Sequence, residues 1–317
     1  MATLVHTWYF KYQVSFCHTS GVSDPLQLQR NPRRRPRLSD ADTEGRMLAA
    51  GERLIATQGL SLSLEHLRME ELITDAGVSR TSSYRRWPTK DLYAADLLLH
   101  VAEHTQLTDD LTVYLDATSR LAPDLVTGIT TPQGRRDLIV ELMRLITAAD
   151  FTLALASSTW RGFVMLRAAH GGLPDGTLRA RVAAALSATE RGFQSRREAA
   201  LRAAAGLMGY RLRDASSVDW PDLALLTSAS FTGLLIQAYS DPDAVLGEST
   251  RTAFGSTRAA PWSAATLAQA FLFFGAAEPD PAVAWDDERL ATTGAALGDL
   301  RATLGALWVA DEQRQRS

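Results

Sequence analysis

The chain has 317 residues, 46% of them hydrophobic, and a formal net charge of −3, which is an ordinary balance for a globular protein with a buried core. Its one cysteine, Cys17, excludes an internal disulfide framework and a multi-cysteine zinc site, and we expect a reducing, cytoplasmic location. The longest apolar run, at 264–277, is shorter than the roughly 20 residues of a membrane-spanning helix, so no membrane partner is expected.

Charge is unevenly distributed along the chain. Residues 1–93 carry 13 Lys and Arg against 10 Asp and Glu, whereas residues 94–317 carry 20 against 26. The N-terminal part is therefore positive and the remainder negative, which favours an anionic partner for the N-terminal part alone. Its cations gather in "RNPRRRPR" at 30–37 and in "GVSRTSSYRRWPTK" at 77–90, a stretch with four cations and no acid.

The first 40 residues end in a run rich in Pro and Arg, which cannot continue a helix and predicts a flexible extension over 1–40. From that point the spacing of apolar residues becomes helical. Ser39 or Asp40 is a suitable N-cap for the first helix, and Gly59 ends it.

Two short helices follow. The pattern predicts one over 69–76 that stops at Gly77 and another over 80–86. Ser79 is placed to cap the second of them, and Pro88 closes it. Thr89 can then cap a longer helix that runs to about residue 104.

Beyond residue 106 the Ala- and Leu-rich segments keep the helical period, and no alternating strand pattern competes with it. The helices are expected at 109–121, 133–149, 151–169, 175–206, 219–240, 262–276 and 284–312. The sequence therefore predicts an all-α protein with an extension at 1–40, a small helical domain at 41–105 and a larger one at 106–317.

A short helix, a turn with a glycine and a second short helix are the layout of a helix-turn-helix, whose second helix enters the DNA major groove. Leu72, Ile73, Ala76, Val78 and Tyr84 can supply its small core. The face left exposed would carry residues that hydrogen-bond bases and phosphates: Arg80, Thr81, Ser82, Ser83 and Arg85.

The stretch "AGVSRTSSYRRWPTK" at 76–90 resembles the DNA-binding domain of the tetracycline-repressor (TetR) family of bacterial regulators. The resemblance covers about residues 41–105 and rests on these matching positions: Ala76, Gly77, Val78, Ser79, Tyr84, Trp87 and Lys90. It implies a homodimeric transcriptional repressor that binds a palindromic DNA operator and responds to a small-molecule effector. It also implies that Tyr84 and Lys90 contact phosphates while Arg80, Thr81, Ser82 and Arg85 face bases.

Composition supports the role of Lys90, because the chain has only two lysines against 31 arginines. Two features depart from the family pattern. The linker between the first two helices is about four residues longer than usual, and Tyr93 stands where a Leu is expected, with Leu92 one position early. Neither departure falls in the expected recognition helix.

The arginines of the N-terminal arm fit the same picture. A flexible cationic arm can enter the minor groove beside a helix-turn-helix or follow the phosphates. Arg33, Arg34 and Arg35 are therefore candidate DNA contacts. A solvated tail that adds only nonspecific affinity explains the run equally well.

The resemblance implies that the C-terminal helices bind a small ligand and dimerise. The helix at 219–240 has a broad apolar stripe, and four small residues on it would let a partner helix approach: Ala224, Ser228, Ala229 and Gly233. With the helix at 262–276 it can form a four-helix dimer interface, or both helices can lie in the monomer core. Aromatic and apolar side chains suit an apolar effector, and the candidates for its pocket are Trp160, Phe163, Met165, Phe193 and Tyr210, although such a stripe is also typical of plain core.

Two other classes of function remain open. One is a helical enzyme or small-molecule carrier whose basic segment is only a solvated face, and the other is a DNA-binding protein without an effector. No catalytic group, cofactor or metal site is expected. His100 and His104 lie four residues apart, but two imidazoles near a helix end are usually solvated.

Overall fold

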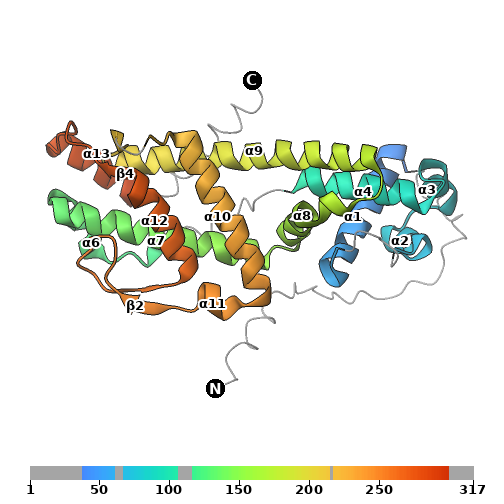
Figure 1. The fold of residues 1–317 in the computed structure, drawn as a ribbon, viewed down its shortest axis with the longest axis horizontal. Coiled ribbons are helices and arrows are strands. Elements are labelled where there is room, and N and C mark those ends of the chain that lie inside the picture. Colours follow the sequence, from blue (N-terminus) through green and yellow to red (C-terminus); the bar gives the residue numbers. More distant parts are fainter. Residues whose placement is uncertain (1–37, 61–66, 106–115, 215–216, 300–317) are drawn as a thin grey trace, which may run out of the picture. The chain divides into compact units, whose positions relative to one another are not determined.

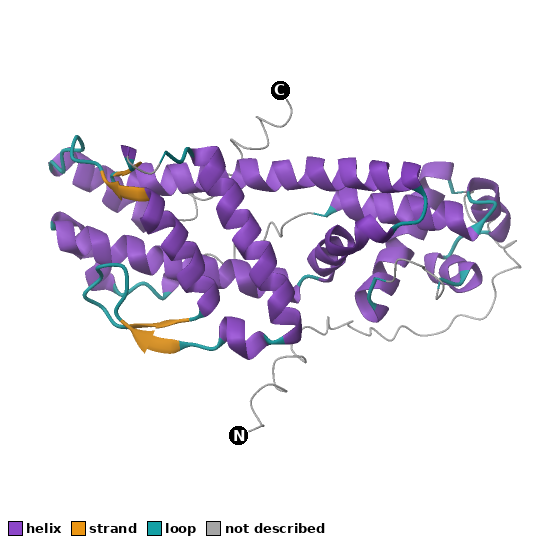
Figure 2. Ribbon diagram, in the orientation of Figure 1, coloured by secondary structure: helices purple, strands orange, loops and turns teal. Residues whose placement is uncertain are grey.

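The computed structural model describes residues 38–60, 67–105, 116–214 and 217–299 (Figure 1). The chain divides into two units, Met1–Leu38 and Ser39–Ser317, and every described element belongs to the second. These elements are almost all helices, joined by two small β-ribbons (Figure 2). The predicted all-α class is confirmed for the described part of the chain.

The first four helices begin and end where their capping residues predict. They are α1 (Asp40–Gln58), α2 (Met69–Ala76), α3 (Arg80–Arg86) and α4 (Lys90–His104). Ser39 and Asp42 form a capping box at the start of α1, in which each side chain accepts a hydrogen bond from the other residue's backbone N–H. Gly59 ends the helix with a φ of 83°, a left-handed value that favours glycine.

In the middle of the chain, the boundary between two predicted helices lies at a different residue. Its helices are α6 (Pro123–Thr127), α7 (Pro132–Ala156), α8 (Ser158–Ala169) and α9 (Gly176–Leu207), with 3₁₀ turns η1 (Gly128–Thr130) and η2 (His170–Gly172). The predicted break at residue 150 is wrong, because α7 continues until Ser157. There the Ser157 hydroxyl accepts a hydrogen bond from the backbone N–H of Trp160 and starts α8. Most of the helix predicted at 109–121 lies outside the described residues.

The last part combines helices with four very short strands. Its helices are α10 (Trp220–Ser240), α11 (Pro242–Leu246), α12 (Ala264–Ala276) and α13 (Asp287–Gly298). Strand β1 (Tyr210–Leu212) pairs antiparallel with β4 (Ala277–Pro279), and β2 (Ser249–Arg251) pairs antiparallel with β3 (Ala260–Trp262). The sequence did not predict strands, since three residues are too few for a period of two to show.

Two large hydrophobic cores and one small cluster hold these helices together. The first joins α1, α2 and α4 to α8, α9 and α10, and its fully buried side chains include Met47, Tyr93 and Leu97. The second lies among α7, α10, α12 and the strand β1, around Leu138 and Phe273. Because α4 packs against α8 and α9, the helices at 41–105 share a core with those that follow them.

Helix α10 is the one described helix that is long and apolar enough to cross a membrane. Core helices of water-soluble proteins meet the same two conditions. Leu223, Phe231 and Leu235 of α10 are buried, and the helix packs against α7, α9 and α12. This burial is typical of a core helix.

Candidate nucleic-acid interface

Helices α2 and α3 are joined by a tight turn at residues 77–79. Gly77 adopts a left-handed conformation with φ 64° and ψ 34°, and its backbone N–H donates to the carbonyl of Thr74. The N–H of Val78 reaches back to the carbonyl of Ile73, 3.3 Å away. These bonds satisfy the last carbonyls of α2, and a side chain at Gly77 would strain the turn.

Ser79 fixes the start of α3. Its hydroxyl accepts a hydrogen bond from the backbone N–H of Ser82 at 3.1 Å. The hydroxyl of Ser83 donates to the Ser79 carbonyl, also at 3.1 Å, and Ser83 is fully buried. The prediction that Ser83 is exposed is therefore wrong, because Ser83 lies on the face of α3 that turns inward.

The other predicted residues of α3 lie on its outer side. Arg80, Thr81 and Arg85 are exposed, and Ser82 is half-buried. Tyr84 is 41% exposed, so the prediction that it belongs to the core is wrong. This position on the outer side leaves the Tyr84 ring open to a partner.

Trp87 takes the core place instead of Tyr84. Its side chain is fully buried, and its indole N–H donates to Asp96 at 3.0 Å. The ring meets Tyr93 edge to face, with centroids 5.2 Å apart. Trp87 therefore anchors the end of α3 to α4.

Tyr93 stands where the TetR-family pattern has a Leu, and the structure places it in the core. Its ring is fully buried, and its hydroxyl donates to the carbonyl of Met47 in α1 at 2.8 Å. Burial raises the pKa of the Tyr93 phenol far above its usual value. Leu92, the neighbouring residue, is half-exposed. Tyr93 thus occupies a core position that joins α4 to α1, while Leu92 faces outward.

Glu70, on α2, contacts two of the predicted DNA-contacting residues. One carboxylate oxygen lies 2.6 Å from a guanidinium nitrogen of Arg80. The other accepts a hydrogen bond from the Tyr84 hydroxyl at 3.1 Å. This hydrogen bond raises the pKa of Tyr84, and slight desolvation and the Glu70 charge add to it.

The remaining arginines of α3 also meet acids from other helices. Arg85 pairs with Asp40 at the start of α1. Arg86 binds both Glu44 of α1 and Asp96 of α4, at 2.9 and 2.8 Å. Sequence reasoning missed these acids, because they lie 10 to 45 residues from their partners and only the fold brings them together.

Lys90 begins α4, next to the end of α3. The side chain of Thr89 caps this helix by accepting a hydrogen bond from the N–H of Leu92. A residue in the first turn lies near the positive end of the helix dipole, which favours a bound anion. The candidates Arg33, Arg34 and Arg35 lie outside the described residues.

Three of the five effector-pocket candidates contact one another. Trp160 and Phe163 of α8 stack with centroids 5.5 Å apart, and both meet Phe193 of α9 edge to face. Met165 is exposed on α8, and Tyr210 is buried in the second core. Trp160, Phe163 and Phe193 therefore form one aromatic cluster, to which Met165 and Tyr210 do not belong.

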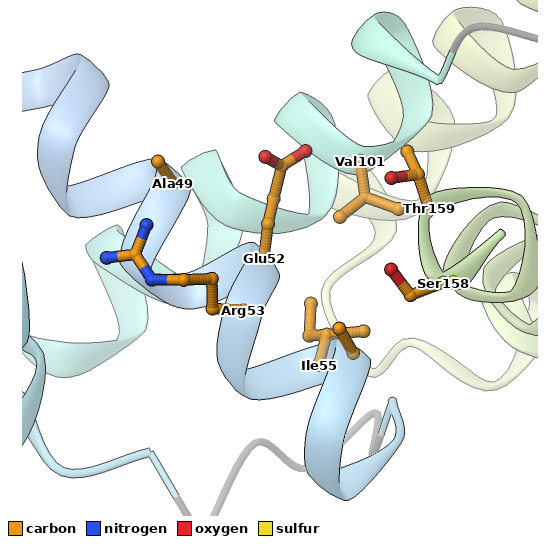
Figure 3. Close-up of a pocket in the computed structure, with 9 residues that line it drawn as sticks. Ala49, Glu52, Arg53, Ile55, Val101, Ser158 and Thr159 are labelled. Atoms are coloured by element: carbon orange, nitrogen blue, oxygen red, sulfur yellow. The ribbon is translucent and has the colours of Figure 1, made fainter. Parts of the chain in front are cut away.

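A pocket of about 230 Å³ lies elsewhere, between α1, α4 and α8. Glu52 of α1 lies on one side of it and Ser158 and Thr159 of α8 on the other, and the apolar residues Ile55 and Val101 also line it (Figure 3). The aromatic cluster does not contribute to the residues that line it.

Helices α10 and α12 leave a face of apolar side chains uncovered. Phe271 of α12 is 71% exposed, and Leu225, Leu226 and Ile236 of α10 are each more than 40% exposed. Of the four small residues expected at a partner helix, Ala229 and Gly233 are exposed, whereas Ala224 and Ser228 are buried in the monomer. The expectation is therefore wrong for Ala224 and Ser228.

The histidines of α4 form a stacked pair. The rings of His100 and His104 lie 4.3 Å apart, and His100 is 3.3 Å from a carboxylate oxygen of Glu52. Within the described ranges, no group of three or more His, Cys, Asp or Glu residues is arranged to hold a metal ion. His100 thereby links α4 to α1.

Comparison with known proteins identifies no relative. No protein-family model, curated protein or solved structure matches this chain.

Proposed function

We propose that the chain is a sequence-specific DNA-binding regulator of transcription, acting as a repressor whose DNA affinity depends on a small molecule. In this proposal α2 and α3 form a helix-turn-helix, α3 enters the major groove, and the protein works in the cytoplasm where its operator lies. The observation that carries the proposal is the outer face of α3, where Arg80, Thr81 and Arg85 are exposed beside Tyr84.

The side chains of that face suit their proposed targets. Arginine can bind the O6 and N7 atoms of guanine in a bidentate manner, and hydroxyl side chains accept or donate at base edges. Tyr84 on α3 and Lys90 at the start of α4 are the proposed phosphate contacts. The resemblance of residues 76–90 to the TetR family points to the same roles.

The aromatic cluster supports an effector of apolar, aromatic character. Trp160 is buried, and its indole N–H has no hydrogen-bond partner in the described structure. A buried donor without a partner is costly. A planar ligand with one acceptor, inserted between Trp160, Phe163 and Phe193, would supply that partner and repack α8 against α9.

The uncovered face of α10 and α12 supports a homodimer. Exposed apolar patches on a water-soluble surface mark interaction sites, and a two-fold axis would bring the same face of a second copy against this one. A palindromic operator needs two recognition helices. We therefore propose that Phe271 and Leu225 pack against their counterparts in the partner.

The direct test is selection of bound sequences from a random duplex pool by the purified full chain, at about 150 mM salt so that purely electrostatic binding is suppressed. We expect enrichment of a palindrome. If no sequence is enriched and binding occurs only at low salt, the basic stretch is a solvated face and the proposal is wrong. Turnover of a small molecule without DNA affinity would then favour the helical enzyme or carrier.

A further inference from the structure

Glu70 contacts two of the proposed DNA-contacting residues of α3 at once. It is the second residue of α2, and its two oxygens hold different partners: the Arg80 guanidinium at 2.6 Å and the Tyr84 hydroxyl at 3.1 Å. Arg80 is proposed to face bases and Tyr84 to face phosphate. A single carboxylate thus occupies both side chains while DNA is absent.

This carboxylate offers the same chemistry as a DNA phosphate. Both are anionic oxygen acceptors for a guanidinium and a phenol. The side chains of Arg80 and Glu70 are 72% and 48% exposed, and exposed ion pairs are weak. The phosphates of an approaching duplex can therefore replace Glu70 as the partner of Arg80 and Tyr84. The unpaired Glu70 carboxylate then faces the anionic DNA backbone.

Glu70 opposes binding to the two kinds of duplex to different degrees. On a random sequence Arg80 leaves Glu70 for a phosphate, which replaces one anionic acceptor by another and leaves Glu70 unpaired beside the DNA backbone. On the correct sequence Arg80 would turn to a guanine edge, a neutral acceptor that offers two hydrogen bonds and does not compete with Glu70 for the charge of Arg80. An acid at this position therefore weakens nonspecific binding more than specific binding.

We propose that Glu70 is a specificity residue, which competes with DNA phosphates for Arg80 and Tyr84 and so lowers the affinity for random duplex relative to operator. The proposal rests on the proposed function. It assigns Glu70 to selection between duplexes, with no direct contact to a base.

Glu71 provides a matched control. It is the next residue of α2, carries the same charge in the same helical turn, and pairs with Arg68, which is outside α3, at 3.7 Å. Glu71→Gln changes the net charge of the protein and the charge near the α2 dipole as Glu70→Gln does. A difference between the two variants therefore reports the contacts of Glu70.

The test compares the full chain, Glu70→Gln and Glu71→Gln on a random duplex and on the selected duplex over a range of salt. For Glu70→Gln we expect random-duplex affinity to rise about threefold. The log affinity against log salt slope should steepen by about 1. Affinity for the selected duplex should change less, so the specificity ratio falls. Equal effects in the two variants, or an unchanged ratio, would overturn the proposal.

A second measurement follows the contact without DNA. NMR titration of ring-labelled tyrosine, with Tyr84 assigned through Tyr84→Phe, should show a lower pKa for Tyr84 in Glu70→Gln than in Glu71→Gln, because only the first substitution removes the carboxylate that raises it. A Tyr84 pKa that is the same in both variants would contradict the contact. Absence of duplex binding by the unchanged chain, even at low salt, would overturn the proposed function as well. If the unchanged chain binds its selected duplex and the two variants bind alike, only the role of Glu70 is overturned.

Discussion

At the scale of single residues, the cations of the proposed interface lie on two helices. Arg80, Arg85 and Arg86 belong to α3, and each meets a carboxylate from another helix. Lys90 occupies the first turn of α4, where the helix dipole adds to its own charge. Because α3 is the proposed recognition helix and Lys90 a proposed phosphate contact, we expect Arg80 and Arg85 to contribute mainly to sequence preference and Lys90 to affinity for any duplex.

Lys90→Ala tests this division. Because a phosphate contact carries no sequence information, the variant should bind all duplexes more weakly by a similar factor, and its log affinity against log salt slope should be smaller by about 1. Thr81→Ala should change sequence preference instead. Arg181→Ala, which removes an exposed cation of α9, is the control and should leave the slope unchanged. The same slope in Lys90→Ala as in the unchanged chain would contradict the phosphate role.

At the scale of elements, helix ends were largely predictable from the sequence. Ser39, Ser79 and Thr89 all cap the helices assigned to them, because a cap is a local hydrogen bond between residues three apart. The break in the middle was placed seven residues early. No residue near 150 stops a helix. Ser157, which does cap the next helix, has a local sequence like that of several other serines, so the sequence did not single it out.

Contacts between distant segments were not predictable in the same way. The pairs of Arg85 with Asp40 and of Tyr84 with Glu70 depend on how α1, α2 and α3 pack. A single sequence gives the charge of a stretch but not the acids that the fold brings to it. The candidate site could therefore be located from the sequence, while its electrostatics needed the structure.

The loop between β2 and β3 makes another such contact, with Asp137 of α7. Asp137 of α7 is buried and accepts hydrogen bonds from the backbone N–H of Thr257 at 2.8 Å, from its hydroxyl at 2.7 Å and from the Gln133 amide at 2.9 Å. Burial raises the pKa of Asp137, but these hydrogen bonds lower it, and the net shift is downward. The ionised carboxylate thus ties the loop to α7.

Asp137→Asn should lower the free energy of unfolding by about 1 to 3 kcal/mol at pH 7, because an amide cannot accept all three bonds. The pKa is lowered on folding, so this stabilisation exists above the unfolded value of about 3.9 and is lost as pH falls through the folded value. Urea unfolding at pH 7 and at low pH should therefore show a difference that shrinks in acid. Glu248→Gln, at an exposed acid, should cost little. A difference independent of pH would contradict the role of the ionised group.

At the scale of the whole molecule, the proposed dimer depends on a surface that the monomer leaves apolar. Phe271 of α12 and two leucines of α10, Leu225 and Leu226, are exposed, and α10 and α12 contact each other. In a two-fold dimer each residue of the interface occurs twice, once in each copy. A single substitution there acts on both halves of the interface.

Phe271→Glu should weaken self-association by at least about 100-fold, since it removes two buried aromatic rings and places two charges in an apolar interface. Sedimentation velocity over a concentration series should show a dimer for the unchanged chain and a monomer for the variant. Met165→Glu adds the same charge at an exposed residue of α8 and should remain dimeric. Similar thermal melting of the two variants by circular dichroism would confirm that both are folded. A monomeric unchanged chain would contradict the proposed interface.

The length of α9 gives the molecule a mechanical property. Its 32 residues form one unbroken helix, about 48 Å long at 1.5 Å per residue. Near its middle Thr189 donates a hydrogen bond to the carbonyl of Ala102 in α4, and 13 residues later Arg202 packs on Trp220 of α10. These two contacts lie about 20 Å apart along the helix axis, so a tilt of about 5° at one of them displaces the other by about 2 Å. Because α9 is continuous, a small change in packing beside α10 would move Thr189 far enough to break its hydrogen bond to α4.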